Sequence, residues 1–162
     1  MPDREAVRPP MPWADLAGAG FTTADESSLP RMPVRDGAFG YRNLNVEDQQ
    51  TDAGSFLNWM ERVIRTRRAW PVIGWGEWQL LGTRESRALA HVATWSGTSF
   101  LAVHNFADEA VRVSIRIPTS ALGGRWRHLI GSGDDEPQVA SGRLTIEIEP
   151  YGYHWFGATE GV

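Results

Sequence analysis

The sequence predicts a mainly β protein in which a loop-rich segment and one long amphipathic helix precede an antiparallel β-sandwich. Three observations lead to this fold class. From Gly76 onward, apolar and polar residues alternate in short runs, which is the period of a strand with one buried face. Residues 52–70 instead carry apolar side chains at three- and four-residue steps, as an amphipathic helix does. Before that helix, proline and glycine repeatedly interrupt the chain.

The strand pattern is clearest over residues 111–117 and 144–149, where every second residue is Val, Ile or Leu. Ser96-Gly97-Thr98-Ser99 lies between Trp95 and Phe100 and is typical of a hairpin turn. Gly, Asp and Pro separate the runs, so short antiparallel strands in a sandwich are expected. Further candidate strands are residues 77–81, 88–95, 100–105, 125–130 and 152–156.

The helix expected at residues 52–70 would begin where Asp52 or Ser55 can accept a hydrogen bond from a free amide. Glu61 and Arg65 have the spacing of a favourable ion pair, and Pro71 prevents the helix from continuing. Arginines crowd the last turns, where positive charge suits the helix dipole, and we interpret them as a solvated face. The apolar stripe consists of Phe56, Leu57, Met60, Val63 and Ile64.

Residues 1–51 contain too many prolines and glycines for a domain of their own, yet they include large apolar side chains that a free loop would not expose. We therefore expect a long structured loop packed on something else, with a short strand at residues 44–46 before the helix. The expected divisions are residues 1–51, 52–70 and 71–162. The large side chains are Met11, Trp13, Phe21, Phe39 and Tyr41.

The composition argues against several classes of function. A net charge of −4, with sixteen arginines and no lysine, offers no basic field for a nucleic acid. No apolar run is long enough to cross a membrane, and no signal peptide is recognisable. The absence of cysteine removes disulfides and thiolate chemistry and agrees with a reducing compartment. We expect a soluble, cytoplasmic protein with no nucleic-acid or membrane partner.

The residues themselves indicate no metal or cofactor site. His91, His104, His128 and His154 lie in or beside expected strands, and none of them has helical metal-ligand spacing to another. No Gly-x-Ser-x-Gly nucleophile elbow is present. The segment at residues 131–135 has the glycines of a phosphate loop but no following helix or lysine, so it predicts a turn. Three adjacent acidic residues could bind a hard cation, but a solvated loop fits them better: Asp134, Asp135 and Glu136.

The second half of the chain is rich in aromatic residues, which either fill the sandwich core or form a sugar-stacking surface. Core filling is the interpretation we favour. The residues concerned are Trp70, Trp75, Trp78, Trp95, Trp126, Trp155, Tyr151 and Tyr153.

Several motifs in order resemble the segment that closes the barrel of alpha-amylase superfamily proteins (glycoside hydrolase family 13). They also resemble the antiparallel domain that follows it there, most closely on the trehalose synthase (maltose alpha-D-glucosyltransferase) side. In this sequence they are Arg8-Pro9-Pro10-Met11-Pro12-Trp13, Ala19-Gly20-Phe21-Thr22, Asn45-Val46 with Gln49, residues 55–68, 71–76 and 150–156. The resemblance implies that residues 52–70 are the last helix of a (β/α)8 barrel and that residues 71–162 are the C-terminal sandwich.

The same resemblance places the catalytic carboxylates of these enzymes upstream of the Arg8 motif, so no catalytic residue is expected in this chain. Arg8 is similar to an arginine that pairs with an active-site aspartate and shapes the subsite for the non-reducing glucose. It is the one substrate-binding residue that carries over. Pro9 stands where threonine is usual and Pro12 where glutamine is usual, which removes two polar side chains from that rim.

Two functions follow as expectations. The first is a C-terminal fragment of a trehalose synthase-like alpha-glucosyl transferase or hydrolase, inactive alone, whose partner would be a separate catalytic barrel subunit. Because Met1 stands just before the Arg8 motif, we expect a truncated gene product or half of a split enzyme. The alternative is a non-catalytic module that binds an alpha-glucan or docks on a partner. An isolated helix stripe should then self-associate or be buried on the sandwich.

Overall fold

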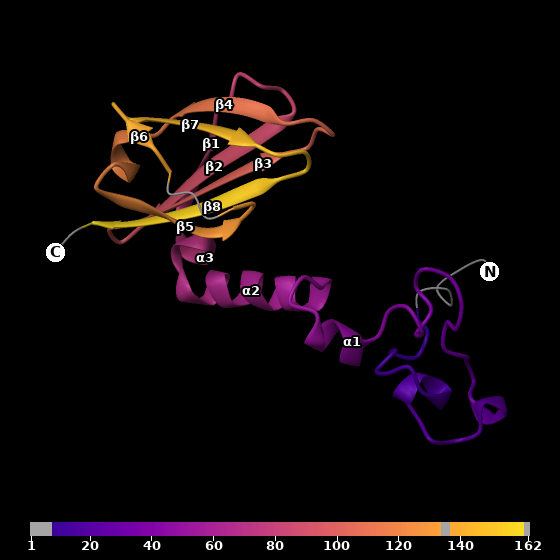
Figure 1. Ribbon diagram of the computed structural model, residues 1–162. Helices are drawn as coiled ribbons and strands as arrows, with labels where there is room; N and C mark the ends of the chain where they lie inside the picture. The colour runs from indigo at the N-terminus through magenta and orange to yellow at the C-terminus, as the bar shows by residue number, and fades with distance from the viewer. Residues whose placement is uncertain (1–7, 134–136, 161–162) are drawn as a thin grey trace. The chain divides into compact units, whose positions relative to one another are not determined.

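The computed structural model describes residues 8–133 and 137–160, and the chain divides into two compact units, Met1–Arg62 and Val63–Val162 (Figure 1). No helix within the described residues is long and apolar enough to span a membrane. The three-part division expected from the sequence, at residues 51/52 and 70/71, stays a prediction.

The second unit consists of two antiparallel sheets, which confirms the mainly β fold class. Figure 1 shows the smaller sheet lying over the larger one. The larger sheet has the order β1 (Glu77–Leu81), β2 (Ala88–Trp95), β3 (Thr98–Asn105), β8 (Tyr153–Glu160), β5 (Gly124–Gly131). The smaller sheet has the order β4 (Val111–Arg116), β7 (Arg143–Ile148), β6 (Val139–Ala140).

The core lies between the two sheets and follows the alternation in the sequence. Along β4, Val111, Val113 and Ile115 are buried while Arg112 and Arg116 are exposed. The facing positions of the larger sheet are also apolar. The buried cluster includes Ala90, Val92, Leu101, Val103, Trp126, Leu144, Ile148, Phe156 and Ala158. The period of two therefore places one apolar face of each sheet against the other.

A two-residue hairpin joins β2 to β3. Trp95 pairs with Thr98, and both connecting residues have positive φ, 49° at Ser96 and 73° at Gly97. A turn with two left-handed residues matches the twist of the flanking strands. The expected hairpin is therefore present, but β3 begins inside the segment that the sequence assigned to the turn.

The outer face of the larger sheet is partly covered by the end of α2 (Phe56–Ala69), by Trp70 and by the short α3 (Val72–Trp75). Trp70 and Val72 are buried against Ala93, Phe100 and Ala102. A second apolar layer thus joins the helix to the sheet. Its packing confirms that Trp70 rests on the sandwich.

The helical region differs from the expected single helix over residues 52–70. A separate α1 (Val46–Thr51) comes first, and Asp52 ends it by donating its backbone amide to Asp48 O. Ser55 Oγ then accepts from Asn58 N at 3.2 Å, so α2 starts at Phe56. No residue of α2 is buried: Phe56, Leu57 and Ile64 of its apolar stripe are exposed, and Met60 and Val63 are half-buried.

The strand expected at residues 44–46 is wrong. Asn45 is the N-cap of α1, with its Oδ1 accepting from Asp48 N at 2.9 Å, and Val46 is the first helical residue. Asn45 Nδ2 also donates to Tyr41 O at 2.9 Å. A capping asparagine before acidic residues favours a helix start over a three-residue apolar run.

The loop-rich first unit is structured, but it buries less than we expected. Tyr41 is 4% exposed. Met11, Trp13 and Phe21 are each about half exposed, and Phe39 is 79% exposed. The expectation that these large side chains pack is therefore met only at Tyr41.

Candidate functional site

Arg8, the one substrate-binding residue expected from the sequence, lies at the exposed start of the described chain. No carboxylate within the described residues forms an ion pair with it. The segment that follows is anchored: Val46 N donates to Pro12 O and Glu47 N to Trp13 O, both at 3.0 Å. The backbone beside Arg8 is therefore fixed against the first turn of α1, while its side chain is left open.

The sequence motifs of the first unit are joined to one another by hydrogen bonds. The amides of Trp13 and Ala14 donate to Ala19 O at 2.9 and 3.2 Å. Ala19 is fully buried and has a left-handed φ of 57°, which alanine adopts at a cost. The strained turn closes the loop that carries the Arg8 motif.

Gln49 links the two helices of this region. Its backbone oxygen accepts from Ser55 Oγ at 2.6 Å and from Asn58 Nδ2 at 2.8 Å, and its side-chain oxygen accepts from Leu57 N at 3.1 Å. The bond from Leu57 N satisfies a free backbone amide at the start of α2, and the other two hold side chains there against Gln49. In this chain the motif glutamine has a structural role.

Large apolar side chains remain exposed along the first unit, which together with Arg8 forms the first candidate site. Large exposed apolar patches on soluble proteins often mark interaction sites. The exposed residues in the described part are Met11, Trp13, Leu16, Phe21, Met32, Val34, Phe39, Leu44, Phe56 and Leu57.

The four histidines form two neighbouring pairs in the larger sheet, which the sequence did not indicate. His91 on β2 and His104 on β3 lie with ring centroids 6.5 Å apart and nearly parallel, at 6°. His128 and His154 lie 5.6 Å apart. Strand register creates both pairs: His91 and His104 lie on the two strands of one hairpin, whereas His128 and His154 lie on strands distant in the sequence, whose register a single sequence does not reveal.

Burial lowers the pKa of both His91 and His104, and the charge of His91 lowers the pKa of His104 further. His104 also stacks on Tyr153 at 6.0 Å. No group of three or more metal-ligating side chains occurs among the described residues.

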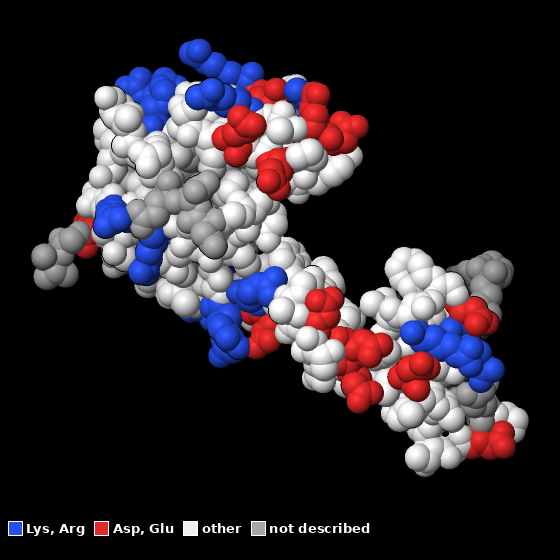
Figure 2. Space-filling view, in the orientation of Figure 1, with Lys and Arg blue, Asp and Glu red and all other residues white. Residues whose placement is uncertain are grey.

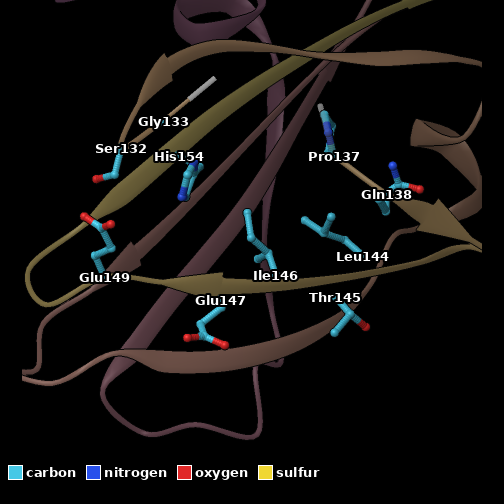
Figure 3. A pocket seen from close by; sticks show the side chains of 10 residues that line it. All are labelled: Ser132, Gly133, Pro137, Gln138, Leu144, Thr145, Ile146, Glu147, Glu149 and His154. Carbon is cyan, nitrogen blue, oxygen red and sulfur yellow. The ribbon is translucent and has the colours of Figure 1, made fainter. Parts of the chain in front are cut away.

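A pocket of about 530 Å³ opens at one end of the sandwich (Figure 3). Figure 3 shows Ile146 and Glu147 on opposite sides of β7, with His154 across from Ile146. Its lining consists of Ser132, Gly133, Pro137, Gln138, Leu144, Thr145, Ile146, Glu147, Glu149 and His154.

The residues between Gly133 and Pro137 are the three acidic cation candidates, Asp134, Asp135 and Glu136, which lie outside the described residues. Before them, β5 ends at Gly131, and Ser132 N donates to Tyr153 O at 3.0 Å. Gly131 is thus the last residue of β5, and Gly133 lies in the bend that follows it.

The tryptophans divide between core and surface. Trp70 and Trp126 are buried, which agrees with core filling. Trp75, Trp78 and Trp95 are 77%, 68% and 46% exposed. Trp78 borders an apolar groove of about 560 Å³ on the outer face of the larger sheet. The groove is lined by Ile73, Gly74, Gly76, Trp78, Leu80, Leu89, His91, Ala93 and Phe100.

The distribution of charged side chains does not indicate a nucleic-acid-binding surface on either unit. In the view of Figure 2, the described residues of both units carry acidic and basic side chains interspersed. Mixed charges of this kind give no field that would concentrate a nucleic acid.

Comparison with known proteins adds sequence relatives. The family described as "Sucrose hydrolase-like, C-terminal domain" matches residues 97–157. The trehalose synthase/amylase of Mycobacterium tuberculosis is 29% identical over 97% of this chain and 26% of its own length. The trehalose synthase of Thermus thermophilus is 28% identical over 95% of this chain and 16% of its own length. An oligo-1,6-glucosidase of Parageobacillus thermoglucosidasius is 24% identical over 65% of this chain. The chain spans about a quarter or less of the length of these relatives.

Solved structures share the fold. The trehalose-6-phosphate hydrolase of Bacillus licheniformis superposes with a TM-score of 0.68 at 22% identity, covering 93% of this chain and 25% of that protein. A trehalulose synthase superposes with a TM-score of 0.65 at 24% identity, covering 91% and 25%. The sequence resemblance is thus confirmed: trehalose synthases and oligo-1,6-glucosidases, which are alpha-amylase family proteins, are sequence relatives of this chain, and the solved structures share its fold.

Proposed function

We propose that this chain is the C-terminal part of a trehalose synthase-like alpha-glucosyl transferase or hydrolase, and that it is inactive until it docks on a catalytic barrel. The observation that carries the proposal is the exposed apolar surface of the first unit, defined above, together with a match to only a quarter of the relatives' length. Arg8 would then contribute to the active-site rim of the assembled protein.

The chemistry supports inactivity of the isolated chain. Retaining hydrolysis or transfer of a glucosyl group needs two carboxylates about 5–5.5 Å apart across the scissile bond. In the family that the sequence resembles, these groups stand upstream of the Arg8 motif. Arg8 is a permanent planar charge suited to a bidentate carboxylate partner, and a barrel would supply that partner.

The proposal is tested first by assaying the purified chain for maltose–trehalose interconversion and for alpha-glucoside hydrolysis. We expect no turnover, for the wild type and for Arg8→Ala alike. Turnover that a point substitution in this chain abolishes would overturn the proposal, because the chain would then hold its own catalytic groups.

Docking is tested by adding the separately produced barrel portion of a trehalose synthase relative. We expect binding, and we expect Phe39→Asp to weaken it at least about tenfold, near 1.4 kcal/mol, because the 79% exposed Phe39 side chain would meet the partner. Tyr151→Asp is the matched control, since Tyr151 is 70% exposed but belongs to the second unit. Equal losses in both variants, or no binding at all, would contradict docking through the first unit.

A binding module for an alpha-glucan is the second candidate, because Trp75 and Trp78 present aromatic faces on which sugars stack. Affinity electrophoresis on glycogen and the tryptophan emission with added maltooligosaccharide test it. Unchanged mobility and emission would exclude this function. We place either function in the cytoplasm, which the absence of cysteine supports.

A further inference from the structure

The free edge of β1 differs from the other sheet edges in the described part of the second unit. β1 pairs with β2 in an unbroken register over all five of its residues, and four of the five are exposed. It contains no proline, glycine, lysine or arginine. Such a flat and regular edge presents unpaired backbone groups and favours pairing with another strand.

The remaining edges carry features that discourage pairing. β5 has two arginines, Arg125 and Arg127, and a register shift between His128 and Ile130. β4 exposes Arg112 and Arg116, and β6 is only two residues long. Charges, irregular register and short length all protect an edge strand. β1 carries one charged residue, Glu77 at its first position, and has no arginine, no register shift and five residues in unbroken pairing with β2.

We propose that β1 pairs antiparallel with β1 of a second copy of this chain, about a two-fold axis through Gln79. In this register all five residues of the strand are paired. Trp78 of each copy lies opposite Leu80 of the other copy, on the same face of the sheet, so the two-fold axis creates two equivalent Trp78–Leu80 pairs. It also sets Glu77 opposite Leu81, so the two carboxylates are kept apart.

The face on which Trp78 and Leu80 lie supports a second copy as the occupant. Their partners on β2 are Ala93 and His91, so they stand on the outer face beside the apolar groove. Trp78 is 68% exposed and Leu80 58% exposed, and pairing would cover both. Apart from the indole N–H of Trp78, His91 supplies the only polar side chain of the groove, which is poorly suited to a sugar.

A cross-link tests the register directly, since the chain has no cysteine of its own. Gln79→Cys places two thiols opposite each other across the axis, and mild oxidation should give a covalent dimer. Glu77→Cys is the control: in the same register the residues 77 of the two copies are about 14 Å apart, which is too far for a disulfide bond. Efficient cross-linking of both variants, or of neither, overturns the register.

Sedimentation across a concentration series tests the association without a covalent bond. We expect a reversible dimer for the wild type. Leu80→Lys should raise its dissociation constant at least tenfold, whereas Leu89→Lys, on the same face but on β2, should leave it unchanged. A wild-type chain that stays monomeric at 100 µM, or a dimer that Leu80→Lys does not weaken, refutes the proposal. Phe39→Asp should leave the dimer intact, so this result is independent of barrel docking.

Discussion

Trp70 can lie on the sheet because Gly157 has no side chain. A Cβ atom at Gly157 would be 2.5 Å from Cη2 of the Trp70 indole, well inside contact distance. The guanidinium of Arg127, the residue paired with Gly157 across the strands, lies 4.8 Å from the ring centroid. The indole therefore contacts both a bare backbone and a cation.

We expect Gly157→Ala to lower the free energy of unfolding by about 1–3 kcal/mol, because the added methyl group overpacks this contact. Urea unfolding followed by circular dichroism measures it. Gly82→Ala is the control, since a Cβ there meets nothing within 4 Å, and it should change stability by less than about 0.5 kcal/mol. In Trp70→Ala the cost of Gly157→Ala should largely disappear, and a cost that persists would rule out this contact as its cause.

Asn105 satisfies backbone groups from two segments of the second unit, residues 107–109 and 148–149. It is 2% exposed. Its Nδ2 donates to the carbonyl oxygens of Glu109 at 2.8 Å, Ile148 at 3.2 Å and Glu149 at 2.8 Å, and its Oδ1 accepts from Ala107 N at 2.8 Å. The end of β3 is thereby fastened to the turn that leaves β7.

The variant Asn105→Asp keeps the shape but turns a carboxylate toward those carbonyls. We expect a loss of about 3 kcal/mol at pH 7, because one oxygen of the buried carboxylate then faces three carbonyl oxygens, while only the other keeps a donor, Ala107 N. The pKa of the new carboxyl is raised by this surrounding, so the loss should shrink as the pH falls and the protonated group donates again. Unfolding at pH 7 and pH 4.5, with the wild type alongside, checks this. A loss that does not depend on pH would contradict it.

At the scale of the elements, the neighbouring strands β2 and β3 carry a pH response. The pKa values of His91 and His104 are lowered in the folded chain, by burial first and, for His104, by the other imidazole. The unfolded chain then binds these protons more readily than the folded one. The stability that depends on neutral histidines is therefore full above the unfolded pKa of 6.5 and is lost as the pH falls below it.

We expect the double substitution His91→Gln with His104→Gln to flatten the dependence of the unfolding free energy on pH between pH 7 and pH 5. Both imidazoles are only about half buried, so the slope that disappears should be modest. Urea midpoints at half-unit pH intervals give the slope. An unchanged slope in the double variant would assign the response to other groups.

The elements that could be predicted from sequence are those whose side chains alternate over five or more residues. β4 and β7 are of this kind, because each buries one face against the other sheet. The two-residue β6 was missed, since so short a strand has no period. Residues 44–46 looked like a strand because Leu44 and Val46 are apolar, but the cap at Asn45 decides the local structure.

Predictability of the candidate sites followed the same division. Arg8 could be named because it lies inside a short local motif, and its role stays a prediction. The pairing of His128 with His154 and the exposed β1 edge could not be named in advance, because they depend on which distant strands become neighbours. Strand order and register arise from long-range packing, which one sequence does not display.

At the scale of the whole molecule, the two units differ in how much they bury. Among the described residues up to Arg62, the buried apolar side chains are Ala14, Ala19, Pro33 and Tyr41. The second unit buries a continuous core between two sheets. A unit with little buried apolar surface opens at low free energy.

Hydrogen exchange measured by mass spectrometry should therefore show fast exchange over residues 8–62 and slow exchange in β3, β7 and β8. Adding a catalytic barrel should slow the first unit and leave those strands unchanged, if the first unit docks as proposed. Equal protection of both units in the isolated chain would contradict this distribution of stability.

The contact between Trp70 and Gly157 also has a mechanical meaning. α2 runs out of the first unit and ends where Trp70 meets β8, and β8 is hydrogen-bonded on both sides, to β3 and to β5. A pull on the helix is thus delivered to an interior strand, which is held by two rows of hydrogen bonds, whereas an edge strand is held by one.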